Sequence, residues 1–194
     1  MTVDKTDIKD QIVAAARSIF NKFGFRKTTM DEIAHSLGKG KSSIYYYFTS
    51  KEEIYKAVVD HEAEFLRNEI VKSTSQYDNP ANKLKYYVLT RMRTFRKVSN
   101  FYDAIRSEVL SHLEIINKIR DKYDKEEMGI LQNILEEGIK KGVFRIEDPE
   151  LTAIAIVTAL KGLEVPMIWS NKNDNAEEQL EQLLNVFFYG IIKQ

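Results

Sequence analysis

A run of aromatic, basic and hydroxyl side chains, GKGKSSIYYYFTSKEE, occupies residues 38–53. Lysine ammonium groups and serine or tyrosine hydroxyls are groups with which proteins bind phosphate oxygens and the polar edges of bases. Among the residues of this run that carry such groups, the candidates for binding are Lys39, Lys41, Ser42, Ser43, Tyr45, Tyr46, Tyr47 and Lys51. The chemistry that they offer is the non-covalent binding of a polyanion.

Spacing within this run separates inward from outward positions. Ile44 and Phe48 are four residues apart, so a helix places both on one face, and we expect them in a core. Tyr46 and Tyr47 then point outward with hydroxyls available for phosphates. Tyr45 lies one position round from Ile44, so packing and DNA contact both stay open for it. A helix cannot bury three consecutive residues on one face, and core packing alone therefore does not explain the tyrosine row.

The sequence predicts three helices around the side chains that could bind a polyanion. Apolar residues at helical spacing predict a helix over about 7–23, ended by Gly24. The sequence Thr29-Met30-Asp31-Glu32 has the form of a capping box and begins a second helix, which Gly38 ends. A third helix of barely two turns then carries the tyrosines. Two short helices around a glycine turn describe a helix-turn-helix.

In a helix-turn-helix, the first residues of the second short helix reach base edges. We therefore expect Lys41, Ser42 and Ser43 to approach bases, and Lys51, at the start of a fourth helix, to neutralise a phosphate. The distribution of charged residues along the chain also favours a DNA contact near the N-terminus. Nine Lys or Arg and five Asp or Glu lie within residues 1–51, a net charge of +4, and because the whole chain is neutral the remainder carries −4.

The rest of the chain is also predicted to be helical. Asn79-Pro80 and Asp148-Pro149 each place a capping side chain before a proline at the first helical position. The predicted helices span about 50–72, 80–98, 101–141, 149–164 and 175–191; glycines 138 and 142 fray the long one, and Pro166 kinks or ends the next. No strand pattern is visible, so the expected fold is all-α, with a helix-turn-helix domain at 1–50 and a larger helical domain at 51–194.

The block from about 12 to 58 resembles the DNA-binding domain of the TetR family of bacterial transcriptional regulators. Phe20 to Ala34 follow the pattern F-x-x-x-G-F/Y-x-x-T-T-x-x-E-I-A, and Ile44 to Glu53 follow I/L-Y-Y-Y-F-x-S-K-E-E. We add Thr29 to the expected DNA contacts. One departure is Lys39-Gly40, where the family usually has a small hydrophobic residue and then Ser or Thr. Gly40 gives up the side-chain cap and Lys39 adds a cation, so the operator preference does not transfer.

The resemblance implies a second helical domain that binds a small-molecule effector, and a homodimer built on the last two helices. The residues independently favour a dimer, because a helix at 149–164 that is apolar on every side needs two neighbours. A symmetric dimer would set two recognition helices against two half-sites of double-stranded operator DNA.

Candidate effector contacts are inward cations and aromatics. Arg91 falls on an apolar stripe with Tyr87 and Phe95. A buried cation is costly unless it is paired, so Arg91 is a candidate ligand contact. Its alternatives are to extend its guanidinium to the surface or to form an ion pair with Glu108 or another acid.

Two further candidates lie later in the chain. His112 shares an apolar face, where a hydrogen-bonded core histidine is the alternative, and Trp169 lines a pocket mouth or packs at the dimer seam. The mix suggests an apolar effector with an acidic group.

We therefore expect a one-component repressor that a small molecule releases from its operator. The alternative is a DNA-bound adaptor or nucleoid-associated protein that senses no ligand. An enzyme has little support, because the chain has no Cys, no glycine-rich phosphate loop and only three scattered His, at 35, 61 and 112. We expect no cofactor and no metal site. A polar N-terminus and the lack of a long apolar run favour a cytoplasmic protein without a membrane partner.

Overall fold

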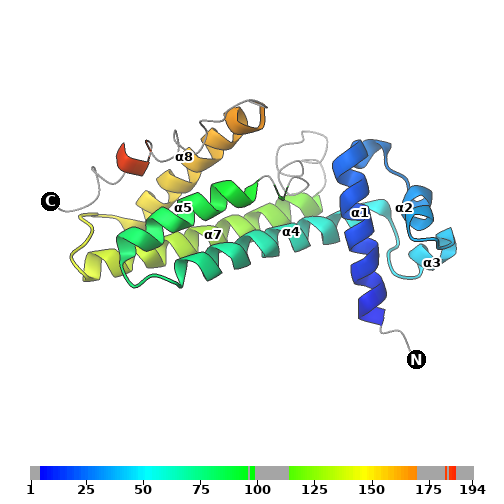
Figure 1. The fold of residues 1–194 in the computed structure, drawn as a ribbon, viewed down its shortest axis with the longest axis horizontal. Helices are drawn as coiled ribbons and strands as arrows, with labels where there is room; N and C mark the ends of the chain where they lie inside the picture. Colours follow the sequence, from blue (N-terminus) through cyan, green and yellow to red (C-terminus); the bar gives the residue numbers. More distant parts are fainter. Residues whose placement is uncertain (1–4, 96, 99–113, 170–181, 183, 187–194) are drawn as a thin grey trace. The chain divides into compact units, whose positions relative to one another are not determined.

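The computed structural model describes residues 5–95, 97–98, 114–169, 182 and 184–186. Throughout these residues the chain is helical and contains no β-strand, which confirms the all-α expectation (Figure 1). The helices are α1 (Lys5–Lys27), α2 (Met30–Ser36), α3 (Lys41–Tyr45), α4 (Lys51–Thr74), α5 (Pro80–Phe95), α7 (Glu114–Lys140) and α8 (Pro149–Trp169). We call α1, α2 and α3 the head.

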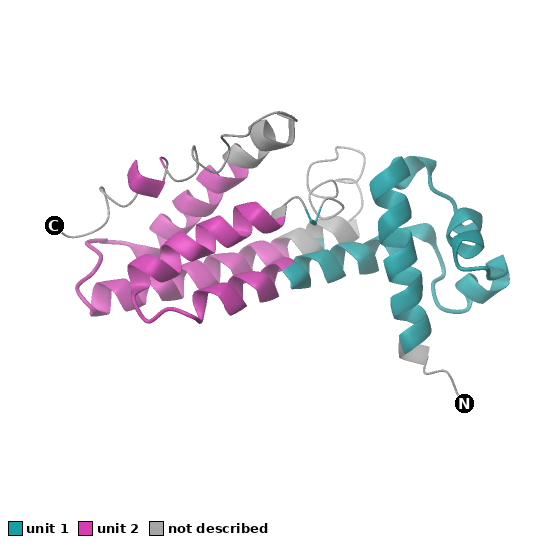
Figure 2. Cartoon of the chain, in the orientation of Figure 1, with its two compact units in different colours: residues 1–65, 97–120 teal, residues 66–96, 121–194 magenta. Residues whose placement is uncertain are grey.

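The chain divides into two compact units, shown in Figure 2. Unit 1 comprises residues 1–65 and 97–120, and unit 2 comprises residues 66–96 and 121–194. The expected boundary at residue 50 falls inside unit 1. The beginning of α4 belongs with the head because its Tyr55 ring meets the rings of Phe20, at 5.0 Å between centroids, and Phe25, at 4.8 Å.

The core of unit 1 joins α4 to the three helices of the head. Residues of all four helices and of the turn after α3 are buried in it: Ile12, Ala16, Phe20, Met30, Ile33, Ala34, Ile44, Phe48, Ile54, Tyr55 and Val58. Their apolar side chains supply the hydrophobic free energy that holds short helices together, since helices of five or seven residues do not persist alone. The fold of the head therefore depends on α4.

Unit 2 is held by ion pairs between helices as well as by an apolar core. Arg67 of α4 pairs with Glu126 of α7, and Lys161 of α8 pairs with Asp124 of α7. Buried residues from α5, α7 and α8 fill the interior: Leu84, Tyr87, Val88, Met92, Leu131, Leu135, Ala153, Ile156, Val157 and Leu160. Each helix of the unit thus contributes one apolar face.

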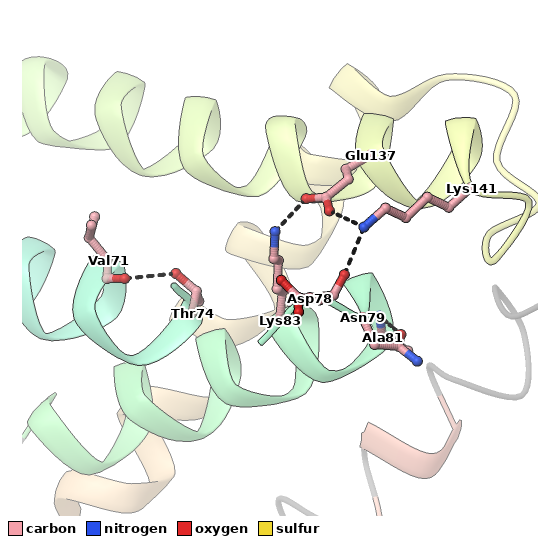
Figure 3. A network of polar contacts seen from close by, with 8 residues as sticks. All are labelled: Val71, Thr74, Asp78, Asn79, Ala81, Lys83, Glu137 and Lys141. Carbon is pink, nitrogen blue, oxygen red and sulfur yellow. Dashed lines mark hydrogen bonds and ion pairs between the residues drawn. The ribbon is translucent and has the colours of Figure 1, made fainter. Parts of the chain in front are cut away.

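A polar network joins the loop before α5 to the end of α7 (Figure 3). Lys83 donates to one oxygen of the Glu137 carboxylate over 2.6 Å, and Lys141 donates to the other over 2.8 Å. Lys141 also donates to the backbone carbonyl of Asp78 over 2.8 Å. Asn79 caps α5 by accepting from the Ala81 N–H, as its position before a proline predicts.

The helix ends differ from expectation at several glycines and at one proline. Gly24 breaks the helical backbone with φ 76°, as predicted, yet helical residues continue to Lys27. Gly142, with φ 69°, ends α7 cleanly, and its N–H bonds to the Ile139 carbonyl. Pro166 does not end α8, which runs three residues further. A proline beyond the first turn removes one backbone donor and crowds the carbonyl four residues back, yet the three residues after Pro166 keep helical geometry.

Gly138 does not fray α7 either. It lies inside the helix with no room for a side chain: a Cβ there would stand 2.0 Å from the Phe144 ring. The predicted fraying at this residue was therefore wrong, because close packing of Phe144 is the reason for the glycine. The last predicted helix, 175–191, lies outside the described residues except for 182 and 184–186.

Candidate nucleic-acid interface

The start of α2 is fixed by the capping box that the sequence predicts. The Thr29 hydroxyl accepts from the Glu32 N–H over 3.2 Å, and the Glu32 carboxylate accepts from the Thr29 N–H over 2.7 Å. The same carboxylate accepts from the Thr29 hydroxyl over 3.0 Å. Thr29 is exposed but its polar groups are engaged within the protein, so its expected DNA contact stays a prediction.

The turn between α2 and α3 is built on two glycines. Gly38 has φ 62°, a conformation that residues with a Cβ rarely adopt, and its N–H bonds to the His35 carbonyl over 3.0 Å. Gly40 is the N-cap of α3 and supplies no side-chain cap, as its lack of a side chain requires. Lys39, between them, is half-buried.

The helix that carries the tyrosines, α3, is shorter than expected. Helix α3 ends at Tyr45, and Tyr46 and Tyr47 form a turn, because the Tyr47 N–H bonds to the carbonyl three residues back, that of Ile44. The expectation of a two-turn helix was wrong in length. The chain nevertheless returns to the core at Phe48, whose N–H also bonds to the Ile44 carbonyl.

Inward and outward positions are as predicted for Ile44, Phe48 and Tyr46, whereas Tyr47, which was expected to point outward, is only partly exposed. Ile44 and Phe48 are buried, while Tyr46 is 65% exposed. Tyr45, which the sequence left open, is 45% exposed, and Tyr47 is half-buried. The rings of Tyr46 and Tyr47 meet edge to face with centroids 4.9 Å apart, which limits how either ring can turn.

Three polar residues open α3. Lys41, Ser42 and Ser43 are all exposed. The Lys41 ammonium lies 2.7 Å from the carboxylate of Asp31 in the first turn of α2. This hydrogen bond, with the charge of Asp31, raises the pKa of Lys41, which keeps the lysine fully charged at neutral pH.

Lys51 has contacts that the sequence did not suggest. Its ammonium donates to the backbone carbonyls of Phe25 and Thr28, over 2.9 Å and 2.8 Å, and lies 4.4 Å from the centre of the Phe25 ring. It thus satisfies carbonyls where α1 ends, and two of its three N–H donors point into the protein. The expected phosphate contact stays a prediction, and the internal bonds add a structural role.

A buried carboxylate ties α4 to the head. Glu62 is fully buried and accepts from Arg17 of α1 over 2.7 Å. Arg17 also donates to the backbone carbonyl of Lys97, which follows α5 in the chain. Sequence reasoning missed this pair, although a signal exists: Glu62 lies four residues from both Val58 and Leu66, on the apolar face of α4.

Two of the expected effector contacts in α5, Tyr87 and Arg91, are buried polar side chains that share one partner. Arg91 is 1% exposed, so its inward position is confirmed, and it pairs with Glu127 of α7. Glu127 is thus an acid with which Arg91 pairs, and Glu108 lies outside the described residues. Tyr87, also buried, donates its hydroxyl to the same Glu127 oxygen over 2.9 Å.

The charge state of this cluster follows from its contacts. Burial raises the pKa of Glu127. The charge of Arg91 and hydrogen bonds from Arg91 and Tyr87 outweigh this effect, so the pKa of Glu127 lies below its ordinary value. Glu127 is therefore ionised at neutral pH. It lies four residues from Tyr123 and from Leu131, so an acid on an apolar stripe was again the missed signal.

The other expected effector residues receive no side-chain description. His112 lies outside the described residues. Phe95 and Trp169 belong to α5 and α8, but their side chains are not described. No group of potential metal ligands occurs in the described part of the chain. Within that part, no helix combines the length and apolar character that a bilayer span requires.

Two family models match the chain. The model of bacterial regulatory proteins of the tetR family matches residues 12–58, which include every expected DNA contact. The model of the tetracyclin repressor-like C-terminal domain matches residues 80–184 and includes every expected effector contact. Together they match residues 12–58 and 80–184, and the second match covers more than half of the chain.

Curated and solved proteins agree with these matches. The HTH-type transcriptional regulator YhgD of Bacillus subtilis, itself uncharacterized, is 26% identical over 161 residues, 81% of each chain. IcaR of Staphylococcus epidermidis, the negative regulator of the biofilm operon icaADBC, is 28% identical over 57% of this chain and 63% of its own.

A transcriptional regulator from Cytophaga hutchinsonii has a TM-score of 0.78 at 26% identity, covering 95% of this chain and 98% of that chain. The fatty acid degradation regulator FadR from Bacillus halodurans has a TM-score of 0.75 at 22% identity, covering 94% and 96%. With both family models matched and a helix-turn-helix in the head, the chain belongs to the TetR family of bacterial transcriptional regulators.

Proposed function

We propose that this regulator is a homodimeric repressor that binds operator DNA through the head and releases it when a small molecule binds unit 2. The observation that carries the proposal is the division of residues 41–48. Ile44 and Phe48 are buried, which leaves Lys41, Ser42, Ser43, Tyr45 and Tyr46 exposed on one short segment. Small polar groups beside aromatic ones suit base edges and sugar-phosphate walls respectively.

The proposed DNA contacts divide into two kinds. Lys41, Ser42 and Ser43 read bases, whereas Thr29, Lys39, Lys51 and the three tyrosines hold the backbone. Selection of random duplexes with the purified protein tests this assignment. An enriched inverted repeat supports a dimeric operator-binding protein. Binding without any enriched sequence would instead favour a nucleoid-associated protein.

Helix α8 supports the proposed dimer because it has two apolar faces. One face is buried in unit 2, at Ala153, Ile156, Val157 and Leu160. The opposite face is exposed, at Leu151, Ile154, Ala155 and Thr158. An exposed apolar stripe of this length suits an isologous interface between two copies of one helix.

Paired charges on the exposed stripe provide the test of the dimer. Leu151→Glu with Ile154→Glu should give monomers in sedimentation velocity, because each charge would have to be buried twice in a symmetric interface. Leu184 is less suitable, since it is buried within the subunit and a charge there would damage the fold. A dimer that persists in the double variant would place the interface elsewhere.

The effector site is proposed in unit 2, around Tyr87, Arg91, Phe95 and Trp169, and the expected role of His112 stays a prediction. Arg91 and Tyr87 support it because they place polar groups inside an apolar unit, where a ligand with few polar atoms can be oriented. A screen of small acids and apolar compounds for release of the selected duplex tests the proposal, with Tyr87→Phe expected to change the dose that releases DNA.

One observation favours a second candidate, a regulator that senses no ligand. Arg91 and Tyr87 already share the Glu127 carboxylate, so both are satisfied without an effector. Such a protein would act as a DNA-bound adaptor. Failure of every compound to release the duplex, with co-purification of a stoichiometric protein partner, would support the adaptor.

A further inference from the structure

Asp31 places a negative charge beside a cation of the proposed DNA-reading segment. It is the second residue of α2, and Lys41 is the first residue of α3. The Nζ–Oδ2 distance between them is 2.7 Å, and the side chains are 51% exposed for Lys41 and 62% exposed for Asp31. The pair thus lies on the surface, where either partner can be exchanged for another ion.

The fold of the head does not depend on this pair. Helices α2 and α3 are held by the buried side chains of Ile33, Ala34 and Ile44. Exposed ion pairs contribute little to folding, because solvent screens the attraction and ordering two side chains costs entropy. The position of the carboxylate therefore calls for a reason other than stability.

A carboxylate at this place acts on DNA binding in two ways. It repels phosphates that approach Lys41, and it holds the ammonium in one direction so that the lysine cannot extend freely toward the backbone. Complexes with unrelated DNA depend on phosphate contacts, so their affinity is lowered most when Asp31 holds Lys41 away from the phosphates. A contact with one base benefits from it, because a preset side chain loses less entropy on binding.

We propose that Asp31 is a specificity-determining residue, whose carboxylate withholds Lys41 from the phosphates of unrelated DNA and presents it to a base of the operator. The proposal rests on the proposed function, since it takes Lys41 as a base contact. Asp31 acts through Lys41 and is a positioning residue, not itself a reader of the sequence. A repulsive element that rejects wrong partners is a common source of specificity.

The variant Asp31→Asn removes the charge and keeps the size of the side chain. Affinity is measured for the selected operator and for a duplex of scrambled sequence at several salt concentrations. Scrambled DNA should bind about two- to fivefold more tightly, the range that the loss of an exposed ion pair allows. Its salt slope should steepen by about 1 per subunit, because Lys41 becomes free to neutralise a phosphate. The ratio of operator to scrambled affinity should fall.

Glu52→Gln is the matched control. Glu52 lies exposed in the first turn of α4, and its neutralisation changes the net charge by the same amount without touching Lys41. Asp31→Asn in a Lys41→Ala background completes the test, because an effect that runs through Lys41 must disappear there.

Three results would overturn the proposal. The first is equal shifts in Asp31→Asn and Glu52→Gln, which would indicate a general charge effect. The second is an Asp31→Asn effect that persists in the Lys41→Ala background. The third is weaker binding to both duplexes. Circular dichroism verifies folding, and Asp31→Ser replaces Asp31→Asn if helix content falls.

This test can be separated from a test of the proposed function. If no operator is selected, the repressor proposal fails, while the scrambled duplex alone still decides whether Asp31 restrains Lys41. If an operator is selected and Asp31→Asn leaves the affinity ratio unchanged, only the role of Asp31 is lost.

Discussion

The pair Lys41–Asp31 in the head and the pair Arg91–Glu127 in unit 2 join similar charges in opposite surroundings. Both members of the first pair are more than half exposed, whereas the side chains of Arg91 and Glu127 are 2% and 14% exposed. Water can replace either partner of the first pair at little cost. In the second pair a charge that loses its partner stays buried and poorly hydrated. Exposure thus sets how much stability is lost when a partner is removed: little for the pair Lys41–Asp31 and much for the pair Arg91–Glu127.

Removing the buried carboxylate should have the largest effect. Glu127→Ala removes the carboxylate with which the buried Arg91 pairs and should lower the free energy of unfolding by about 3–5 kcal/mol. Urea unfolding measures the change. The control is Glu126→Ala on the same helix, whose pair with Arg67 is exposed and should be worth less than about 1 kcal/mol. Equal losses in the two variants would remove the distinction between buried and exposed pairs.

The second-largest loss of stability is expected from a change in side-chain packing in unit 2 that alters no charge. Gly138→Ala would bring a Cβ to 2.0 Å from the Phe144 ring, so the ring must move, and we expect a loss of about 1–3 kcal/mol. Gly129→Ala, in the same helix with nothing within 4 Å of its Cβ position, should instead stabilise the protein by about 0.5–1 kcal/mol. Thermal unfolding compares them, and a neutral Gly138→Ala would contradict the close packing.

Lys51 is half-buried, so it lies between the two extremes. Lys51→Ala leaves the carbonyls of Phe25 and Thr28 without their ammonium donor and should cost about 1–2 kcal/mol of stability. The exposed Lys27→Ala is the control, expected to change stability by less than about 0.5 kcal/mol.

DNA binding by the same variant sharpens the result. If Lys51 also neutralises a phosphate, its replacement should lower the salt slope of operator affinity by about 1 per subunit. An unchanged slope in a folded variant would leave the lysine with its internal role alone.

Glu137 tests whether exposure, rather than location in unit 2, sets the size of an effect. Lys141 and then Lys83 hold the pKa of this part-exposed carboxyl below its ordinary value of 4.5. The ionised form is therefore favoured by folding, so its contribution is complete above pH 4.5 and is lost as pH falls through the lower folded pKa.

The expected size is about 0.5 kcal/mol, as for other exposed pairs. Unfolding of the wild type and of Glu137→Gln at neutral pH and at several values below 4.5 should show two curves that converge in acid. A gap that grows as pH falls would have the wrong sign and would reject the assignment.

Local signals predicted most helix starts and failed at several helix ends. Thr29, Asn79 and Asp148 cap helices as their positions indicate, because a cap is a contact within three residues. Gly138 was misjudged because the partner that requires it, Phe144, is brought close by a turn rather than by helical spacing. Pro166 was expected to kink or end its helix; α8 does not end there but runs to Trp169, and the kink stays a prediction.

Spacing in the sequence predicted which side chains of the site point inward, but it did not predict which residues they pair with. Spacing alone put Ile44 and Phe48 inward and Arg91 inward. The partners of Arg91 and Lys51 lie 36 and 23–26 residues away, and no periodicity within one helix can select them. Acids on apolar stripes, such as Glu62 and Glu127, are the sequence signal that comes nearest to revealing such pairs.

Arg17 gives the head a dependency that its sequence motif does not include. Its guanidinium binds Glu62 and the carbonyl of Lys97, both beyond the stretch that the helix-turn-helix occupies. A head exchanged between relatives at residue 50 would arrive without these two acceptors and would meet whatever the recipient has at those places. A chimaeric regulator joined beyond Glu62 keeps the first of these acceptors, whereas the Lys97 carbonyl would still have to be matched by the recipient.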